Sequence, residues 1–348
     1  MAKQAEAQAG NATIPVLEVH RFDAEPLRRY MAQHMDGIGD DIDVRQFPGG
    51  QSNPTFQIST GGRDYVMRKK PPGQLLPSAH AVDREYRVMK ALQDTDVPVP
   101  KMHVLCEDES ILGTAFFIMD KVPGRVIDDP TLPSFSEADR RDVYDDLLRV
   151  LAALHAVDYE AVGLGDFGRH GNYYERQIGR WSKQYIASKT EEIEAMDQLM
   201  QWLPDNVPQD TTTVLVHGDY RLGNTIVHPD APKISAVLDW ELSTFGHPLA
   251  DLAYCYCACF MGLHHEAVQR PGLPTEEAFV ARYCELTGRD GIPEWTFYKV
   301  FQLFRLAAIV QGVYKRGVDG IASSTKALTY GHVCRERAEK AWEMVETG

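Results

Sequence analysis

HGDYRLGN at residues 217–224 and LDWE at residues 238–241 are the stretches that decide the fold of this chain. Each comes after an apolar run that is typical of a short buried strand, TVLV at 213–216 and ISAVL at 234–238. Polar side chains directly after short strands lie on loops, where binding and catalytic groups are concentrated. The two stretches therefore predict a functional site built by such loops.

The residue types in these stretches suit the transfer of a phosphoryl group. That chemistry needs positioning and charge neutralisation more than covalent help from the protein. An aspartate orients the acceptor hydroxyl and takes its proton, while an amide oxygen and a second carboxylate hold the metal that bridges the nucleotide phosphates. Asp219, Asn224 and Asp239 supply these types in that order. The alternative is three solvated groups on loops, and the ordered set between strands favours function.

The pattern HGDxxxxN followed by DWE resembles the aminoglycoside phosphotransferase and choline kinase group of kinase-like enzymes. The resemblance implies that Asp219 is the catalytic base and that Asn224 and Asp239 are Mg²⁺ ligands. It also implies bracing or supporting roles for three further residues, His217, Glu241 and Asp251.

The order of elements predicts an α+β protein with a two-lobed protein-kinase-like fold, in which a small antiparallel β lobe with one helix precedes a larger, mainly helical lobe. Residues 1–20 are expected to be a flexible N-terminus. Residues 21–122 are expected to form the β-rich, nucleotide-binding N-lobe, and residues 123–348 the C-lobe with the catalytic loop and the acceptor site. This architecture places a nucleotide in the cleft between the lobes.

Sequence patterns place the individual elements. Residues 45–69 alternate as a strand, a turn and two paired strands, with TGGR closing the hairpin. A helix is predicted from Ser78, a buried strand at 115–119, and a long helix after an N-cap at Ser136. The mainly helical part contains one island of β pattern, formed by residues 213–216, 225–227 and 234–238.

A cation and a glutamate in the first half fit the same chemistry. Kinases use a basic side chain on the phosphates and a helix glutamate that aims it. Arg68 ends a predicted strand, and Glu85 lies seventeen residues later on the next helix. The resembled family has Lys or Arg at the Arg68 position, and Lys69 or Lys70 would substitute if the strand bulges. The competing interpretation is a surface ion pair between strand and helix.

Two backbone segments complete the predicted nucleotide site. One lies between the first two strands, where glycines and small polar residues let backbone N–H groups approach phosphates: Gly49, Gly50, Gln51, Ser52 and Asn53. A plain β-turn is the competing interpretation there. The other runs from Asp120 to Val122, where backbone groups are expected to bond to adenine, before a hinge turn at Pro123-Gly124.

Three other patterns are not assigned to the site. GLGDFG at 163–168 contains both GxGxxG and DFG, but no strand precedes it and it lies upstream of the HGD loop, so it is interpreted as an inter-helical loop. The pair His264-His265 supplies too few ligands for a structural zinc site, which needs four. The six cysteines lack CxxC spacing and are interpreted as apolar packing in a reducing compartment.

Composition limits the partners and the location. The formal net charge is −14, which disfavours nucleic acid and anionic membranes as partners. The sequence has no run of eighteen apolar residues and no N-terminal basic-then-apolar signal, so a cytoplasmic protein is expected.

The identity of the acceptor alcohol rests on a closer resemblance. RKKPPGQLLPSAHAVDREYRVMKAL, and later VGLGDFGR with Arg176, Gln177 and Trp181, resemble the kinase-like region of acyl-CoA dehydrogenase family members ten and eleven. The implied function is an ATP- and Mg²⁺-dependent kinase that phosphorylates the hydroxyl of a hydroxyacyl-CoA. A separate acyl-CoA dehydrogenase in the same pathway is the implied partner.

The distribution of charged residues along the chain supports an acceptor other than an acyl-CoA. Up to Val122 there are 14 Lys/Arg against 17 Asp/Glu, and after it 22 against 33. An acidic C-lobe suits a polycationic aminoglycoside, unless Arg176, Arg180 and Lys183 form a local basic patch for an anionic CoA. Those three are equally consistent with a solvated helix face. An aminoglycoside or other small alcohol is therefore the alternative acceptor, and a catalytically silent nucleotide-binding pseudokinase is the alternative of another class.

Overall fold

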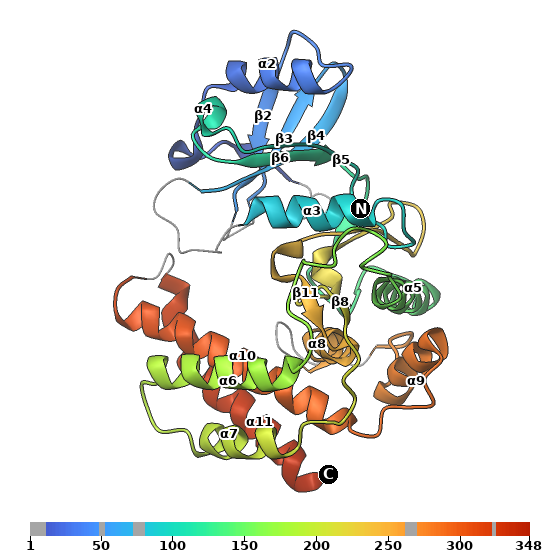
Figure 1. Ribbon diagram of the computed structural model, residues 1–348, viewed down its shortest axis with the longest axis vertical. Helices are drawn as coiled ribbons and strands as arrows, with labels where there is room; N and C mark the ends of the chain where they lie inside the picture. The colour runs from blue at the N-terminus through green and yellow to red at the C-terminus, as the bar shows by residue number, and fades with distance from the viewer. Residues whose placement is uncertain (1–11, 49–52, 72–80, 262–269, 322–324) are drawn as a thin grey trace. The chain divides into compact units, whose positions relative to one another are not determined.

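The structure is a computed structural model that describes residues 12–48, 53–71, 81–261, 270–321 and 325–348. Its contacts divide the chain, drawn in Figure 1, into two compact units. The first unit contains residues 1–165, 221–243 and 268–275, and the second contains residues 166–220, 244–267 and 276–348. The lobe boundary predicted after Val122 stays a prediction.

The first unit contains a six-stranded antiparallel sheet with the order β1-β2-β3-β4-β6-β5. Its strands are β1 (Ile14–Pro15), β2 (Asp43–Gln46), β3 (Thr55–Thr60), β4 (Arg63–Lys69), β5 (Met102–Cys106) and β6 (Phe116–Asp120). Alternate residues of β3 are buried, and the fully buried Phe56 and Ile58 join Met67 and Ile118 in a common core. The alternation read from the sequence is thus the inward and outward alternation of a sheet.

The predicted hairpin between β3 and β4 is confirmed. Thr60 pairs with Arg63, and Gly61 and Gly62 have φ values of 56° and 74°. A two-residue hairpin turn with positive φ at both central positions favours glycine, because a side chain there would be strained. The turn sets the register that places Arg68 opposite Thr55.

The described residues of the first unit include four α-helices. They are α2 (Ala24–His34), α3 (Val82–Leu92), α4 (Glu109–Leu112) and α5 (Glu137–His155), and a short 3₁₀ turn, η1, spans Glu18–His20. The helix predicted from Ser78 is α3, which contacts β5 and β6. Ser136 caps α5 as predicted, because its Oγ accepts a hydrogen bond from the Asp139 N–H at 3.1 Å. The structure adds α2 and α4 to the one helix predicted in the β-rich part.

A second, three-stranded sheet of the first unit has the order β10-β9-β7. It consists of β7 (Arg125–Val126), β9 (Thr225–Val227) and β10 (Ile234–Val237), with the 3₁₀ turns η2 (Leu222–Asn224) and η3 (Trp240–Leu242) beside it. Both turns contain residues of the two sequence stretches that predicted the site.

The second unit is mainly helical. Its helices are α6 (Tyr173–Ser188), α7 (Glu194–Asp205), α8 (Pro248–Phe260), α9 (Glu276–Thr287), α10 (Trp295–Val318) and α11 (Val333–Thr347), with the 3₁₀ turn η4 (Thr325–Tyr330). The long α10 packs on α6, α8 and α11. A two-stranded antiparallel sheet joins β8 (Val214–Val216) to β11 (Thr244–Gly246). All three strands of the predicted β island are present, but they pair in two separate sheets.

The predicted α+β fold class is confirmed. Residues 163–168 form a loop, as expected. All six cysteines are free and buried, as the packing interpretation requires. His264 and His265 lie outside the described residues. Within the described part of the chain, no helix combines the length and the apolar character needed to cross a membrane.

Candidate active site

A cavity of about 580 Å³ in the first unit is lined by half of the predicted site residues. A volume in this range suits a small organic ligand or cofactor. Six of the predicted residues line the cavity: Arg68, Glu85, Asp120, Val122, Asn224 and Asp239. Gly49, Gly50, Gln51 and Ser52 lie outside the described residues. Asn53 is described and fully buried, but it is not among the residues that line the cavity.

One part of the cavity wall is charged. Arg68, near the end of β4, donates from Nη1 to Glu85 Oε1 of α3 at 2.8 Å. It also donates from Nη2 to Asp239 Oδ1 at 2.8 Å, and Glu241 lies 3.7 Å away. The Arg68 and Glu85 side chains are 12% and 2% exposed, whereas Asp239 is 35% exposed. This is a buried network, so the alternative of a surface ion pair does not apply to it.

The Glu85 carboxylate is difficult to keep ionised. Burial raises its pKa to about 7, and the nearby Asp239 and Glu241 carboxylates act in the same direction while Arg68 opposes them. The Arg68 guanidinium faces three carboxylates, those of Glu85, Asp239 and Glu241. A cation bound beside Asp239 would interact favourably with its carboxylate.

Lys69 lies on the opposite face of β4. Its Nζ donates to Thr114 Oγ1 at 2.6 Å, and burial lowers its pKa. Successive strand residues point to opposite sides of a sheet, which separates Lys69 from the cavity that Arg68 lines. Of the three consecutive cations Arg68, Lys69 and Lys70, Arg68 alone is among the residues that line this cavity.

The two predicted metal ligands come from adjacent backbone segments. The Leu238 N–H donates to the Asn224 carbonyl at 2.8 Å, which brings the residue before Asp239 against Asn224. Asp239 has a left-handed backbone (φ 65°, ψ 56°), uncommon for a residue with a side chain, as the chain turns from β10 into η3. The fully buried Trp240 anchors this turn and donates from Nε1 to the Val237 carbonyl at 3.0 Å. Carboxylate and amide oxygens facing one cavity fit Mg²⁺ as a ligand.

Asp120 ends β6 at the wall of the same cavity. Its Oδ1 lies 2.6 Å from His103 Nε2, and its backbone N–H donates to the Lys101 carbonyl at 2.9 Å. That N–H is therefore already bonded, and Lys121 and Val122, which follow the strand and also line the cavity, are the remaining residues of the predicted segment.

The HGD loop belongs to the second unit. It follows β8, and its turn uses Gly218 at φ 83°. The buried Asp251 of α8 accepts the His217 N–H at 2.6 Å on one oxygen and the Gly218 N–H at 2.8 Å on the other. The Asp219 N–H donates to His217 Nδ1 at 3.2 Å. These bonds fix the backbone that carries Asp219.

The contact between Arg305 and the HGD loop was not predicted from the sequence. From the interior of α10 its Nη2 donates to the Gly218 carbonyl at 2.8 Å, and its Nη1 to Gln302 Oε1 at 3.3 Å. Gln302 in turn donates to the Ala250 carbonyl of α8 at 2.8 Å. A signal was present, since Gln302 and Arg305 interrupt the otherwise apolar run VFQLFRLAAIV at 300–310. Polar residues within a buried helix usually have a specific partner.

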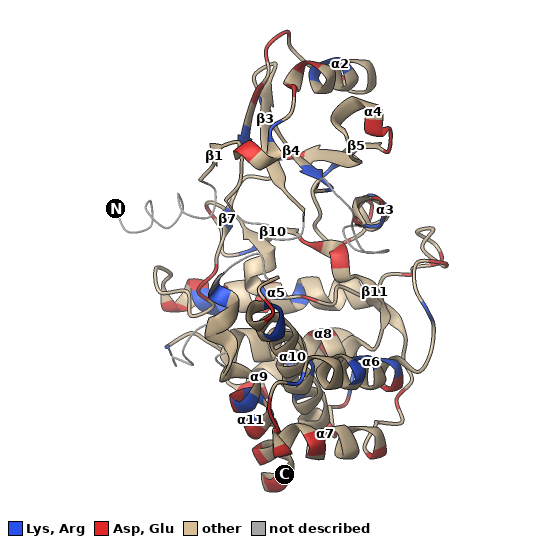
Figure 2. Ribbon diagram, turned by 90° about the vertical axis from the view of Figure 1, so that its left-hand side faces the viewer, with Lys and Arg blue, Asp and Glu red and all other residues tan. Residues whose placement is uncertain are grey.

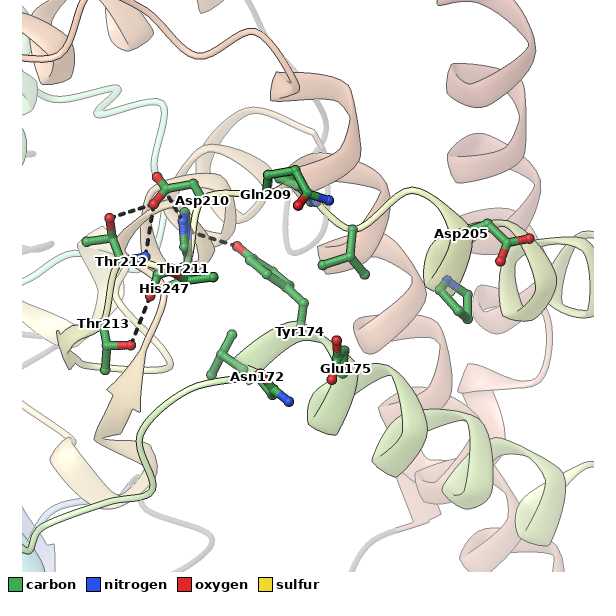
Figure 3. Close-up of a pocket in the computed structure, with 14 residues that line it drawn as sticks. Asn172, Tyr174, Glu175, Asp205, Gln209, Asp210, Thr211, Thr212, Thr213 and His247 are labelled. Atoms are coloured by element: carbon green, nitrogen blue, oxygen red, sulfur yellow. Dashed lines mark hydrogen bonds and ion pairs between the residues drawn. The ribbon is translucent and has the colours of Figure 1, made fainter.

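A second cavity, of about 300 Å³, lies in the second unit beside the first turn of α6 (Figure 3). His247 joins two residues of its wall: His247 Nε2 lies 3.2 Å from Asp210 Oδ2, and its Nδ1 lies 3.4 Å from the Tyr174 hydroxyl. His247 Nδ1 also accepts the Leu249 N–H at 3.3 Å and so caps α8. No residue spacing in the sequence indicated this array, which tethers the helix that carries Asp251.

The sequence pattern of the phosphotransferase enzyme family matches residues 43–298. This match covers most of the chain, from β2 to the first turn of α10, and includes both stretches that predicted the site. The chain belongs to this family. The family assignment confirms the predicted class of enzyme, a phosphotransferase with an alcohol group as acceptor.

Its relatives include mouse acyl-CoA dehydrogenase family member 10, 44% identical over 343 residues, and rat acyl-CoA dehydrogenase family member 11, 42% identical over 347 residues. Each alignment covers 95% of this chain. The chain spans 32% of the mouse protein and 44% of the rat protein, that is, about a third to less than half of their length. The predicted resemblance to members ten and eleven is confirmed.

Solved structures support the phosphotransferase fold. A Ralstonia eutropha protein assigned as an aminoglycoside phosphotransferase is 49% identical with a TM-score of 0.85, over 94% of this chain and 99% of that one. A thermostable mutant of aminoglycoside phosphotransferase APH(4)-Ia, in a ternary complex with ADP and hygromycin B, has a TM-score of 0.61. It is 18% identical, over 92% of this chain and 99% of that one, and shows the fold alone. The expected kinase-like fold is thus confirmed.

Proposed function

We propose that this phosphotransferase transfers the γ-phosphoryl group of ATP, in the presence of Mg²⁺, to the hydroxyl of a hydroxyacyl-CoA. The observation that carries the phosphoryl-transfer part is the buried Arg68–Glu85 pair, 2.8 Å apart, in the wall of a cavity that Asn224 and Asp239 also line. A phosphate clamp and two oxygen ligands in one cavity are the groups that this chemistry needs.

The cavity offers two environments to a nucleotide. Apolar side chains form one part of its wall, among them Val66, Met89, Met119, Ile226 and Leu238. The adenine ring would pack there and bond to backbone groups near Val122, because the Asp120 N–H is already used. Arg68, held by Glu85, would contact the phosphates. Gly49 to Asn53 are proposed to approach the same phosphates through their backbone N–H groups.

Asn224 and Asp239 would hold Mg²⁺ through their amide and carboxylate oxygens. A divalent ion there supplies charge neutralisation for the nucleotide phosphates. The left-handed turn at Asp239 and the buried Trp240 keep the Asp239 carboxylate on the cavity side of the chain. The metal ion and Arg68 would then both interact with the Asp239 carboxylate.

Asp219 is proposed as the catalytic base. Its carboxylate would accept a hydrogen bond from the acceptor hydroxyl and orient the oxygen toward the γ-phosphorus. It would take the proton as the new P–O bond forms and the bond from the γ-phosphorus to the bridging oxygen of ADP breaks. Asp251 and Arg305 bind the backbone at His217 and Gly218, which fixes the position of Asp219 before the acceptor arrives. Preorganisation of this kind lowers the entropy cost of the reaction.

The acceptor is inferred from the relatives. Two proteins that are 44% and 42% identical over this region are named as acyl-CoA dehydrogenase family members, which supports an acyl-CoA carrying a hydroxyl group. An acyl-CoA dehydrogenase that acts on the same class of thioester is the proposed pathway partner. An aminoglycoside remains the second candidate, because the 49% identical Ralstonia protein is assigned to that class and the chain has a net charge of −14.

ADP release distinguishes these acceptors. The protein is incubated with Mg·ATP and a panel of hydroxyacyl-CoAs, free hydroxy acids, aminoglycosides and choline-like alcohols. Turnover with hydroxyacyl-CoAs is expected. Turnover confined to aminoglycosides would replace the proposed acceptor, and ATP binding without turnover on any acceptor would favour a catalytically silent pseudokinase.

A further inference from the structure

Two turns of α6 present arginines on one side of the helix. Arg176 and Arg180 are four residues apart and therefore lie on the same face. Arg176 is half-buried and donates to the carbonyls of Arg169 and His170 at 3.1 and 3.4 Å. Arg180 is exposed, with its guanidinium 4.9 Å from the centre of the Trp181 ring. Figure 2 shows the basic positions along α6 in blue.

Arg305 extends this basic region to the HGD loop. Its guanidinium lies 5.8 Å from the Trp181 ring centre and donates to the Gly218 carbonyl at 2.8 Å. Trp181 is thus contacted by Arg180 and by Arg305. Burial raises the pKa of the half-buried Tyr173 hydroxyl, while Arg305, Arg176 and Arg180 lower it and Asp251 raises it, so all three arginines act on one side chain. We call these three residues the arginine cluster.

In the part of the chain that the structure describes, the arginines of the cluster form no ion pair, although the Asp251 carboxylate, which accepts the Gly218 N–H, lies in the same environment. Among the described residues, no carboxylate forms an ion pair with Arg176, Arg180 or Arg305. Three other arginines of the same unit do pair with carboxylates: Arg282 with Glu285, Arg289 with Asp210, and Arg335 with Glu191. In a chain with 50 acidic and 36 basic residues, an unpaired group of arginines creates a local positive potential that attracts anions.

We propose that the arginine cluster binds the phosphate-bearing end of a CoA-thioester acceptor. This inference rests on the proposed function and names the recognition site of its acceptor. An acyl-CoA carries its hydroxyl on the acyl group and its phosphates at the far end of a flexible arm, so the two ends need separate surfaces. The cluster offers planar guanidinium groups, which match phosphate geometry, and connects through Trp181 and Arg305 to the residue before Asp219.

The positive charge of the arginine cluster disfavours an aminoglycoside as the acceptor. A polycationic aminoglycoside would meet the exposed Arg180 guanidinium and the positive charge of Arg176 and Arg305 behind it, which repel it. The net acidity of the whole chain is a coarser measure than the charge beside the catalytic loop, because screening limits electrostatic interactions to roughly 8–10 Å at physiological salt. The local charge therefore selects an anionic acceptor.

Binding of free CoA tests the cluster without requiring turnover. Calorimetric titration is made with Mg²⁺ and saturating ADP, so that the adenine of CoA cannot use the nucleotide site. Arg180→Glu is the variant, and Arg141→Glu is the matched control, because Arg141 is an exposed helix arginine of α5 that pairs with Glu137 at 3.1 Å. The wild type and Arg141→Glu are expected to bind CoA equally, and Arg180→Glu roughly tenfold more weakly.

Equal binding by Arg180→Glu and the wild type, or no CoA binding by the wild type, would overturn the proposal. A turnover arm separates this failure from failure of the proposed function. The ratio of kcat/KM for a hydroxyacyl-CoA to that for the same acyl group on N-acetylcysteamine, which lacks phosphates, is expected to fall roughly tenfold in Arg180→Glu. If the wild type phosphorylates neither thioester, the proposed function is wrong even where CoA binding depends on Arg180.

Discussion

At the scale of single residues, the Arg68 guanidinium lies 2.8 Å from both Glu85 and Asp239 and 3.7 Å from Glu241. In the proposed reaction this guanidinium also contacts the nucleotide phosphates. Asp239 would then turn toward Mg²⁺, while Glu85 keeps Arg68 in place. A single cation thus links the metal ligand to the helix glutamate.

Replacement of Arg68 tests whether its guanidinium contacts the nucleotide phosphates. Arg68→Met is expected to raise the Kd for Mg·ATP by about tenfold or more, because a charge-assisted hydrogen bond to phosphate is lost. Lys69→Met is the matched control, since Lys69 bonds to Thr114 on the other face of β4 and should leave ATP affinity unchanged. Fluorescent-nucleotide titration measures both variants. A larger effect at Lys69 than at Arg68 would reverse the assignment.

Substitutions of Asp219 and Asp239 by asparagine are expected to impair different steps, turnover alone for Asp219 and nucleotide binding as well for Asp239. Asp219→Asn removes the base but no proposed nucleotide contact, so kcat should fall at least about a hundredfold while ATP binding stays nearly intact. Asp239→Asn should weaken Mg·ATP binding as well, because it removes a metal ligand. Steady-state kinetics and nucleotide titration separate the two effects. Wild-type turnover by Asp219→Asn would exclude Asp219 as the base.

At the scale of elements, α8 and α10 hold the HGD loop from two sides. Asp251 of α8 accepts the His217 and Gly218 N–H groups, and Arg305 of α10 donates to the Gly218 carbonyl that follows them. Asp251→Asn replaces one acceptor oxygen by an amide group that cannot accept a hydrogen bond. We expect a loss of about 2–4 kcal/mol in the free energy of unfolding, together with a lower kcat.

Thermal and denaturant unfolding measure the first effect, and the kinetics of the folded fraction measure the second. An unchanged stability would mean that the Asp251 bonds are not required to hold the loop. Unchanged kcat with reduced stability would show that they support the fold without positioning Asp219.

The Asp210–His247 contact at the start of α8 predicts a pH dependence of stability. Burial opposes ionisation of Asp210, but hydrogen bonds from Thr212 and Arg289 outweigh it and hold its pKa below the usual value. A lowered pKa in the folded state means that the ionised carboxylate stabilises the fold above the unfolded pKa, and that this stabilisation is lost as pH falls.

Asp210→Asn should therefore lower the free energy of unfolding by about 1–2 kcal/mol at pH 7. The difference from the wild type should shrink as the pH falls below about 4. Urea unfolding at several pH values checks both statements. A difference that is constant across this range would show that Asp210 does not stabilise the fold as a carboxylate.

At the scale of the whole molecule, the features that could be predicted from the sequence are those that depend on residues close together in the chain. The Gly61-Gly62 hairpin, the Ser136 cap and the apolar stripes of α3 and α5 each depend on neighbouring residues, and all were predicted. The pairing of Arg68 with Glu85, seventeen residues apart, was predicted from the cation and helix glutamate that kinases use, placed on the predicted strand and helix. The family pattern supplied Asp219, Asn224 and Asp239.

Contacts between distant segments were beyond sequence reasoning. Arg305 bonds to Gly218 across 87 residues, and His247 contacts Tyr174 across 73, with no periodicity to indicate either. The predicted β island divided between two sheets because β8 pairs with β11, a short strand with little apolar signal of its own. Such partners are chosen by the packing of the whole unit, which local patterns do not encode.

Direct analysis of the acceptor tests the central claim of phosphoryl transfer. A hydroxyacyl-CoA is incubated with Mg·ATP and the wild-type protein, and the product is examined by mass spectrometry and phosphorus NMR, with Asp219→Asn as the control. We predict one added phosphoryl group, attached to the acyl hydroxyl, with the wild type and almost none with Asp219→Asn. An acceptor that stays unmodified while ATP is bound, or one that is phosphorylated equally by both proteins, would contradict the account.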